Sequence, residues 1–154
     1  MTTNTKTDEQ YMREALKEAE QALAAKDRPI GTVIVHQGRM IARAHHQVKL
    51  LRDPTAHAVI IAITQGANAL QSDQLPEAVA YVTQEPCAMC TGALLLSGIA
   101  RVVFGIADPK RGACGSVVDL TSNERINRRL IVTKEVLAGE CAALLRKATA
   151  GIHT

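Results

Sequence analysis

Three residues that can bind a metal ion stand out by their type and spacing. His57 precedes the segment Pro86-Cys87-Ala88-Met89-Cys90, in which two cysteines form a Cys-x-x-Cys pair. One imidazole and two thiolates leave the fourth tetrahedral position of Zn²⁺ open, as in catalytic rather than structural zinc sites. Water in that position can lose a proton near neutral pH and attack an amidine carbon. The sequence therefore predicts one Zn²⁺ per chain, bound by His57, Cys87 and Cys90, with water as the fourth ligand.

Each motif has a simpler interpretation when it is taken alone. A single histidine at a helix start is more often a polar cap or a core residue, and a lone Cys-x-x-Cys is equally typical of a redox pair or of half a structural zinc site. A structural site would need a fourth Cys or His ligand, and none lies at a useful spacing. The two motifs together, in this order and each at a predicted helix start, favour the open zinc site.

The elements that must position these ligands follow from the hydrophobic pattern. A first helix, capped by Asp8, has an apolar stripe with steps of three and four residues. Strands are predicted over 32–36 and 39–44, joined as a hairpin by Gln37-Gly38, and over 79–83, 101–105 and 130–133, the last at an edge. Further helices are predicted from 53–55 toward residue 66, over 88–97 and over 136–147. This alternation indicates an α/β fold with three layers, an α/β/α sandwich.

Length, charge and composition limit the classes of protein to which this chain can belong. The 154 residues fit one domain, 1–154, with frayed ends expected at 1–7 and 149–154. A net charge of +3 is too small to indicate nucleic-acid binding by itself. Cys114 and Cys141 lie outside the motif, which suits idle thiols in a reducing cytosol. The polar start, residues 1–10, lacks an apolar signal segment, and the uncharged run 86–100 is too short to span a bilayer. We expect a cytoplasmic protein without a membrane contact.

Six segments carry a resemblance to a known family over nearly the whole chain. It resembles the bacterial tRNA adenosine deaminase group of the cytidine deaminase superfamily, whose signature is His-x-Glu followed by Pro-Cys-x-x-Cys. The resemblance implies a central mixed sheet of about five strands, a homodimer, and an active site bordered by the partner subunit. It also implies hydrolytic deamination of adenosine to inosine in a tRNA anticodon loop. The segments are 28–35, 53–58, 81–90, 101–105, 112–116 and 140–145.

The chain departs from the family pattern at its most important position. Val59 stands where the family has the Glu that moves protons between water, ring nitrogen and leaving amino group. General acid–base catalysis is typically worth about 10² to 10⁴ in rate, and valine has no titratable group. We therefore expect this chain to be inactive or severely impaired. Backbone N–H groups of Ala58 and Cys87 are expected to hold the attacked centre, by analogy with an oxyanion hole.

Two further departures concern the substrate. His46 stands where the family usually has an Asn that hydrogen-bonds the target base, and an imidazole lacks the paired geometry of an amide. The C-terminus lacks the basic, aromatic-containing extension of the tRNA enzymes, which favours a free nucleobase or nucleoside (guanine, adenine or cytosine) as the alternative substrate. The residues left for phosphate contacts are Lys110, Arg111, Arg125, Arg128 and Arg129.

Three interpretations remain open at the level of sequence. The first is a deaminase whose Glu has been replaced to give an inactive enzyme. The second is a natural non-catalytic zinc protein that binds RNA or supports an active partner subunit. The third is a zinc or redox protein without nucleobase chemistry. Retention of all three ligands favours the first two, because a chain free of catalytic selection could lose its ligands as well.

Overall fold

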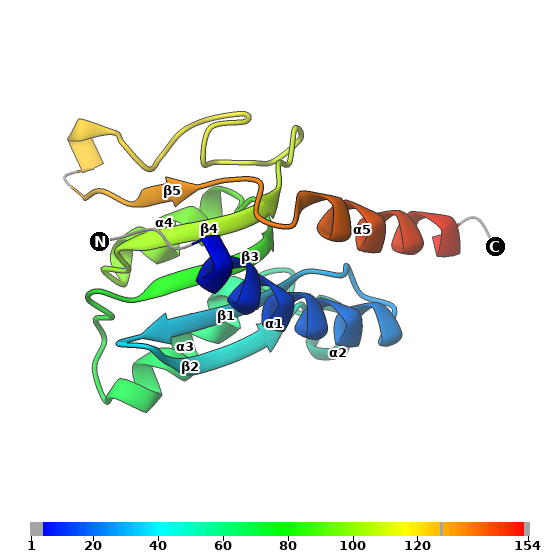
Figure 1. The fold of residues 1–154 in the computed structure, drawn as a ribbon, viewed down its shortest axis with the longest axis horizontal. Helices are drawn as coiled ribbons and strands as arrows, with labels where there is room; N and C mark the ends of the chain where they lie inside the picture. Colours follow the sequence, from blue (N-terminus) through cyan, green and yellow to red (C-terminus); the bar gives the residue numbers. More distant parts are fainter. Residues whose placement is uncertain (1–4, 127, 153–154) are drawn as a thin grey trace.

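The computed structural model describes residues 5–126 and 128–152, and it has a sheet between two layers of helices (Figure 1). The spatial order of the strands is β2-β1-β3-β4-β5. β1 pairs antiparallel with β2 and β3, whereas β3, β4 and β5 are parallel. The predicted three-layer sandwich with a mixed five-stranded sheet is therefore confirmed. The strands are β1 (Gly31–His36), β2 (Arg39–His45), β3 (Val79–Gln84), β4 (Arg101–Ile106) and β5 (Ile131–Thr133).

Helices cover both faces of this sheet. α1 (Thr5–Ala24) and α5 (Ala138–Ile152) pack on one face, where Met12 and Cys141 join Tyr81 and Val103 in a small core. α3 (Ala58–Leu70) and α4 (Ala88–Leu96) pack on the other face, over a larger core that includes Val82. Successive residues of a strand point to opposite faces, which is why neighbours such as Tyr81 and Val82 belong to different cores. Two short helices complete the fold, α2 (Val48–Leu51) and the 3₁₀ helix η1 (Glu124–Ile126).

The predicted strands agree with the structure to within a residue or two, and the helix boundaries differ more. Gln37 and Gly38 both have positive φ, at 49° and 74°, the conformation that a two-residue hairpin requires. At the chain ends, α1 begins at Thr5 and α5 ends at Ile152, and the fraying expected at 1–7 and 149–154 stays a prediction. Residues 1–4 and 153–154 lie outside the described residues.

Asp8 is not a helix cap, contrary to the sequence interpretation. It lies within α1 and is 2% exposed. Its carboxylate accepts a hydrogen bond from the Tyr81 hydroxyl at 2.9 Å and two from the Arg101 guanidinium at 2.9 and 3.1 Å. Because Tyr81 lies on β3 and Arg101 on β4, this buried ion pair fastens α1 to the centre of the sheet.

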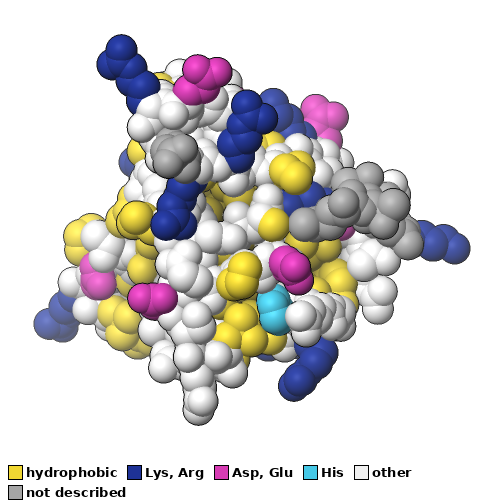
Figure 2. Space-filling view, turned by 90° about the vertical axis from the view of Figure 1, so that its left-hand side faces the viewer, with side chains coloured by type: hydrophobic (Ala, Val, Ile, Leu, Met, Phe, Trp, Pro, Cys, Tyr) yellow, Lys and Arg dark blue, Asp and Glu magenta, His cyan; other side chains and the backbone are white. Residues whose placement is uncertain are grey.

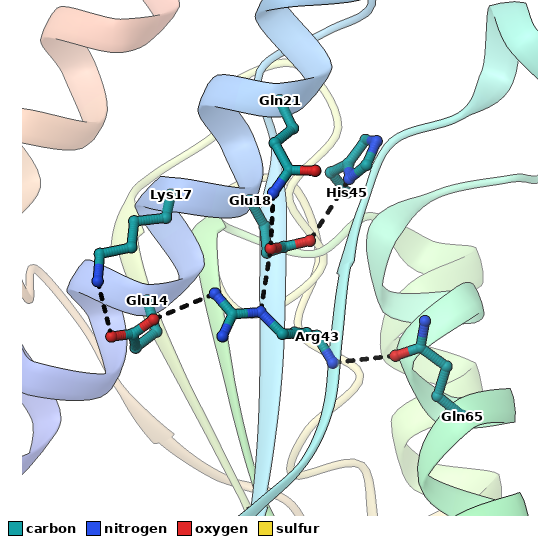
Figure 3. Close-up of polar contacts among 7 residues, drawn as sticks. All are labelled: Glu14, Lys17, Glu18, Gln21, Arg43, His45 and Gln65. Carbon is teal, nitrogen blue, oxygen red and sulfur yellow. Dashed lines mark hydrogen bonds and ion pairs between the residues drawn. The ribbon is translucent and has the colours of Figure 1, made fainter.

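A second polar network joins α1 to the edge of the sheet (Figure 3). The Arg43 side chain, from β2, donates hydrogen bonds at 3.1 Å to Glu14 and to Glu18 of α1. The Arg43 backbone N–H donates at 2.9 Å to the side-chain oxygen of Gln65 on α3. His45 approaches Glu18 at 3.5 Å. The network thus links helices from both layers to one edge strand.

The parallel strands define the end of the sheet at which a site is expected. β3 and β4 both run toward the right in Figure 1, and sites in parallel sheets lie beyond the carboxyl ends of the strands. The opposite end, shown in Figure 2, carries small groups of hydrophobic side chains scattered between Lys, Arg, Asp and Glu. Within the described residues, no helix combines the length and the apolar character needed to cross a bilayer.

Candidate zinc site

Two helix starts bring the three metal ligands together. His57 is the N-cap residue of α3, and Cys87 is the N-cap residue of α4. The Nδ1 atom of His57 lies 3.7 Å from Sγ of Cys87 and 3.4 Å from Sγ of Cys90. Zn–S and Zn–N bonds of normal length at a tetrahedral angle would separate sulfur from nitrogen by about 3.6 Å. The arrangement therefore fits a zinc ion without rearrangement, and no other such ligand group occurs among residues 5–126 and 128–152.

The start of α3 differs from the sequence prediction by a few residues. The backbone N–H and the hydroxyl of Thr55 both donate to Oδ1 of Asp53, at 2.8 and 2.7 Å, and these bonds form a turn before the helix. The helix begins only at Ala58. His57 consequently precedes the first helical residue, as Cys87 does in α4.

The two cysteine thiols of the site differ in pKa. Hydrogen bonding from Cys90, followed by that from His57, lowers the pKa of Cys87 to about 4. The same contact with Cys87, together with burial, raises the pKa of Cys90. Within this pair, the negative charge therefore favours Cys87 over Cys90. Zinc binding by both sulfurs must displace the remaining thiol proton.

Val59 lines the cavity beside the ligands. It is 2% exposed, and the cavity also borders His57, Cys87 and Cys90. The volume of the cavity is about 30 Å³, which is enough for a water molecule. The structure therefore places an aliphatic side chain beside the ligands, at the first turn of α3.

His46 also borders this cavity, but one of its nitrogens is already engaged. Its Nδ1 accepts a hydrogen bond from the Ala58 N–H at 3.0 Å, and its ring stacks on His57 with centroids 4.5 Å apart. Burial, followed by the nearby His57, lowers the pKa of His46 to about 3. The neutral ring therefore carries its proton on Nε2. The Ala58 N–H, expected to hold a reacting centre, is occupied by His46 in this arrangement.

The sequence analysis missed several residues that line the cavity. Glu85 and Asp108 are buried acids at the ends of β3 and β4, and Arg28 donates to the side-chain oxygen of Gln84 at 3.1 Å. Arg111, named only as a phosphate contact, also lines the wall. Residues 108–116, which we call the cavity loop, form part of this wall. In the sequence, the available signals were an acidic residue two positions before Cys87 and another at the start of the Gly-rich segment 108–116.

Comparison with known proteins identifies the family. The model of the cytidine and deoxycytidylate deaminase zinc-binding region matches residues 5–106, which include all three ligands and Val59. The chain belongs to this deaminase family. It is 44% identical to the tRNA-specific adenosine deaminase of Bacillus subtilis (strain 168) over 138 residues, covering 90% of this chain and 86% of that protein. The corresponding Haemophilus influenzae enzyme is also 44% identical, over 90% of this chain and 80% of its own.

Solved structures place this deaminase in the same group. A tRNA:A34 deaminase studied for A-to-I editing at the wobble position of transfer RNA has a TM-score of 0.85 and 38% identity, covering 88% of this chain and 98% of its own. The guanine deaminase from Nitrosomonas europaea has a TM-score of 0.80 and 26% identity, covering 92% of this chain and 84% of its own. The chain therefore shares the zinc-binding fold of the tRNA adenosine deaminases, and His57, Cys87 and Cys90 are the group of described residues that could hold the metal.

Proposed function

We propose that this deaminase homologue binds an adenosine of a tRNA anticodon loop at its zinc cavity and deaminates it extremely slowly or not at all. The observation that carries the proposal is Val59, which occupies the cavity wall beside intact metal ligands. When bound at these ligands, zinc supplies Lewis-acid activation of a water molecule. The missing contribution is proton transfer, and each assisted transfer is typically worth about 10² to 10⁴ in rate.

Neighbouring acids offer little replacement for the absent carboxylate. Glu85 borders the cavity, but its two oxygens accept four hydrogen bonds from residues of the cavity loop. Both oxygens of Glu85 are therefore already engaged by the cavity loop, which leaves neither free to contact a substrate or a water molecule. Asp108 likewise accepts the backbone N–H groups of Lys110 and Arg111 through Oδ1.

The groups that would hold the base are the backbone N–H of Cys87 and the imidazole of His46. With Nδ1 bonded to Ala58, His46 can offer the base one N–H donor, from Nε2. The exposed Arg28 side chain stands at the mouth and would have to turn aside to admit a nucleobase, because the present cavity is small. The Ala58 N–H donates a hydrogen bond to His46. This hydrogen bond would have to break before the N–H could contact the attacked centre.

The mouth of the cavity supports a substrate that carries phosphates. A second cavity of about 290 Å³ adjoins the first and is lined by Arg28, Asp108, Lys110 and Arg111. Three cations around one acid suit phosphates that flank a flipped-out base. A free nucleobase is the second candidate, favoured by the structural similarity to the Nitrosomonas europaea guanine deaminase.

We further propose that the protein acts in the cytoplasm as a homodimer. The large exposed apolar side chains of α2, Leu50 and Leu51, are candidates for burial between two copies. Gel filtration with light scattering tests the assembly, and a monomer at micromolar concentration would contradict it.

Ammonia release by the chain and by its Val59→Glu variant tests the function. The panel contains a tRNA anticodon stem-loop, adenosine, and the free bases guanine, adenine and cytosine. Val59→Gln serves as the control, because it has the size and polarity of Glu without a titratable group. We expect turnover only with Val59→Glu, and the substrate that releases ammonia names the function.

Other results would separate the alternatives. Turnover by the unmodified chain, within tenfold of Val59→Glu, would contradict the assignment of Val59 as the inactivating residue. If both zinc-loaded proteins are inactive but bind the stem-loop, the chain is a non-catalytic pseudodeaminase or the partner of an active subunit.

A further inference from the structure

Glu85 is the most heavily hydrogen-bonded side chain at the cavity. It follows β3 directly, two residues before Cys87, and is 3% exposed. Oε1 accepts the Asp108 N–H at 3.0 Å and the Ser116 hydroxyl. Oε2 accepts the N–H groups of Cys114 at 3.0 Å and Ser116 at 3.1 Å. One buried carboxylate therefore contacts both ends of the cavity loop, 108–116.

The backbone of the same loop is joined to the segment that carries the cysteines. Ala113 N–H donates to the Pro86 carbonyl at 2.9 Å, and Gly112 forms an antiparallel bridge with Cys87. A Cβ atom on Gly112 would overlap the Glu85 carboxylate. The contact is thus so close that residue 112 has no room for a side chain.

These contacts join two parts of the wall of the zinc cavity. The loop contributes Asp108 and Arg111 to the cavity, and the strand end contributes Glu85 and Cys87. Only an ionised carboxylate has two acceptor oxygens for all four donors, since a glutamine would direct its own NH₂ group at N–H donors. Replacing it would leave buried N–H groups without partners and release the loop.

We propose that Glu85 is a positioning residue that locks the cavity loop onto the cysteine segment and so fixes the geometry of Cys87 and of the Arg111 wall. Glu85 acts on the metal through Cys87. The inference rests on the zinc site and is independent of the proposed deamination, since its readouts require no turnover.

The test compares Glu85→Gln with Glu18→Gln. Glu18 is also a buried glutamate (6% exposed), and its partners are Arg43, His45 and Gln21 (Figure 3). None of these residues lines the zinc cavity. Amide hydrogen exchange of residues 108–116 and zinc affinity against a competing chelator are measured for both variants. Glu85→Gln should accelerate exchange in the loop at least about tenfold and weaken zinc binding by about 10- to 100-fold, as losses of outer-sphere partners typically do.

The visible spectrum of the Co²⁺-substituted protein reports the ligand geometry directly. We expect the thiolate and d–d bands to shift in Glu85→Gln and to match the parent in Glu18→Gln. Glu85→Asp retains both acceptor oxygens and should recover part of the zinc affinity. Equal loop exchange and zinc affinity in Glu85→Gln and the parent would overturn the proposal, as would equal effects of the two glutamine variants.

A milder variant keeps the test decisive if Glu85→Gln does not fold. Ser116 is exposed, and Ser116→Ala removes one of the four hydrogen bonds to Glu85. Faster exchange confined to 108–116 would support the lock. Unchanged exchange there would overturn it.

Discussion

Two side chains at the cavity limit the chemistry that we propose for it. Val59 has no titratable group, and the one acceptor nitrogen of the neutral His46 ring already receives a hydrogen bond from the Ala58 N–H. Both side chains are buried and packed, at 2% and 5% exposure. The site is therefore part of the packed core. The reactivity and the stability contribution of its side chains can be measured without any enzymatic turnover.

Cysteine labelling in the metal-free protein should distinguish the four thiols. Since the pKa of Cys87 is lowered to about 4, its thiolate is fully formed above about pH 5. We expect its reaction with iodoacetamide to be almost constant from pH 5.5 to 7.5, where an ordinary thiol would accelerate roughly 100-fold. Burial raises the pKa of Cys114 to about 11 and of Cys141 to about 12, so both should stay unlabelled.

Zinc and a substitution provide the controls for this labelling. Added zinc should protect Cys87, and Cys90→Ala should restore a rate that rises with pH, because hydrogen bonding from Cys90 is the main cause of the lowered pKa. A labelling rate at Cys87 that rises tenfold per pH unit in the unsubstituted chain would contradict the assignment.

His46 and His45 form a matched pair for stability measurements. His46→Ala leaves the buried Ala58 N–H without its acceptor, so we expect a loss of about 1–3 kcal/mol in the free energy of unfolding, in addition to any cavity cost. His45 is partly exposed and has only a 3.5 Å contact with Glu18, so His45→Ala should cost less than about 1 kcal/mol. Urea unfolding at pH 7 measures both, and equal losses would argue against the capping role of His46.

At the scale of elements, close contact between α1 and β1 determines how the first helix sits on the sheet. A Cβ atom on Gly31 would meet the backbone of Ala15 and Ala19, whereas one on Gly92 in α4 would meet nothing within 4 Å. We expect Gly31→Ala to destabilise by about 1–3 kcal/mol through overpacking. Gly92→Ala should stabilise by about 0.5–1 kcal/mol through helix propensity. Thermal unfolding measures both, and a neutral Gly31→Ala would refute the close contact.

Strands and ligands were predictable because they depend on local patterns. The hairpin, the buried strands and the start of α4 follow from apolar periodicity and short motifs, whereas α3 begins a few residues later than predicted. Asp8 was misread as a cap because its partners, Tyr81 and Arg101, are distant in sequence. Glu85 escaped prediction for the same reason, since its donors belong to a loop that follows the next strand. Long-range polar pairing leaves no periodic signal.

At the scale of the whole molecule, a buried ion pair joins the first helix to the sheet. Asp8 and Arg101 have side chains 3% and 5% exposed, and they join α1 to β4. Asp8→Asn would leave a buried charge without its partner, so we expect a loss of about 3–5 kcal/mol in unfolding free energy. The exposed Arg13–Glu140 pair links α1 to α5 at 3.8 Å, and Glu140→Gln should cost less than about 1 kcal/mol. Denaturant titrations compare them, and similar losses would show that burial does not distinguish the pairs.

The sequence position of the cavity loop has a consequence for the protein while it is being synthesised. His57, Cys87 and Cys90 all leave the ribosome before β4, so a nascent chain could capture zinc early. Glu85 emerges with them, but its donors at residues 108–116 follow only after β4. Until then its carboxylate has only water as a partner, and the metal centre lacks one wall. A chain that stalls between residues 90 and 116 would therefore hold a metal at a centre that lacks the cavity loop, and we expect it to lose the metal to a chelator faster than the finished protein does.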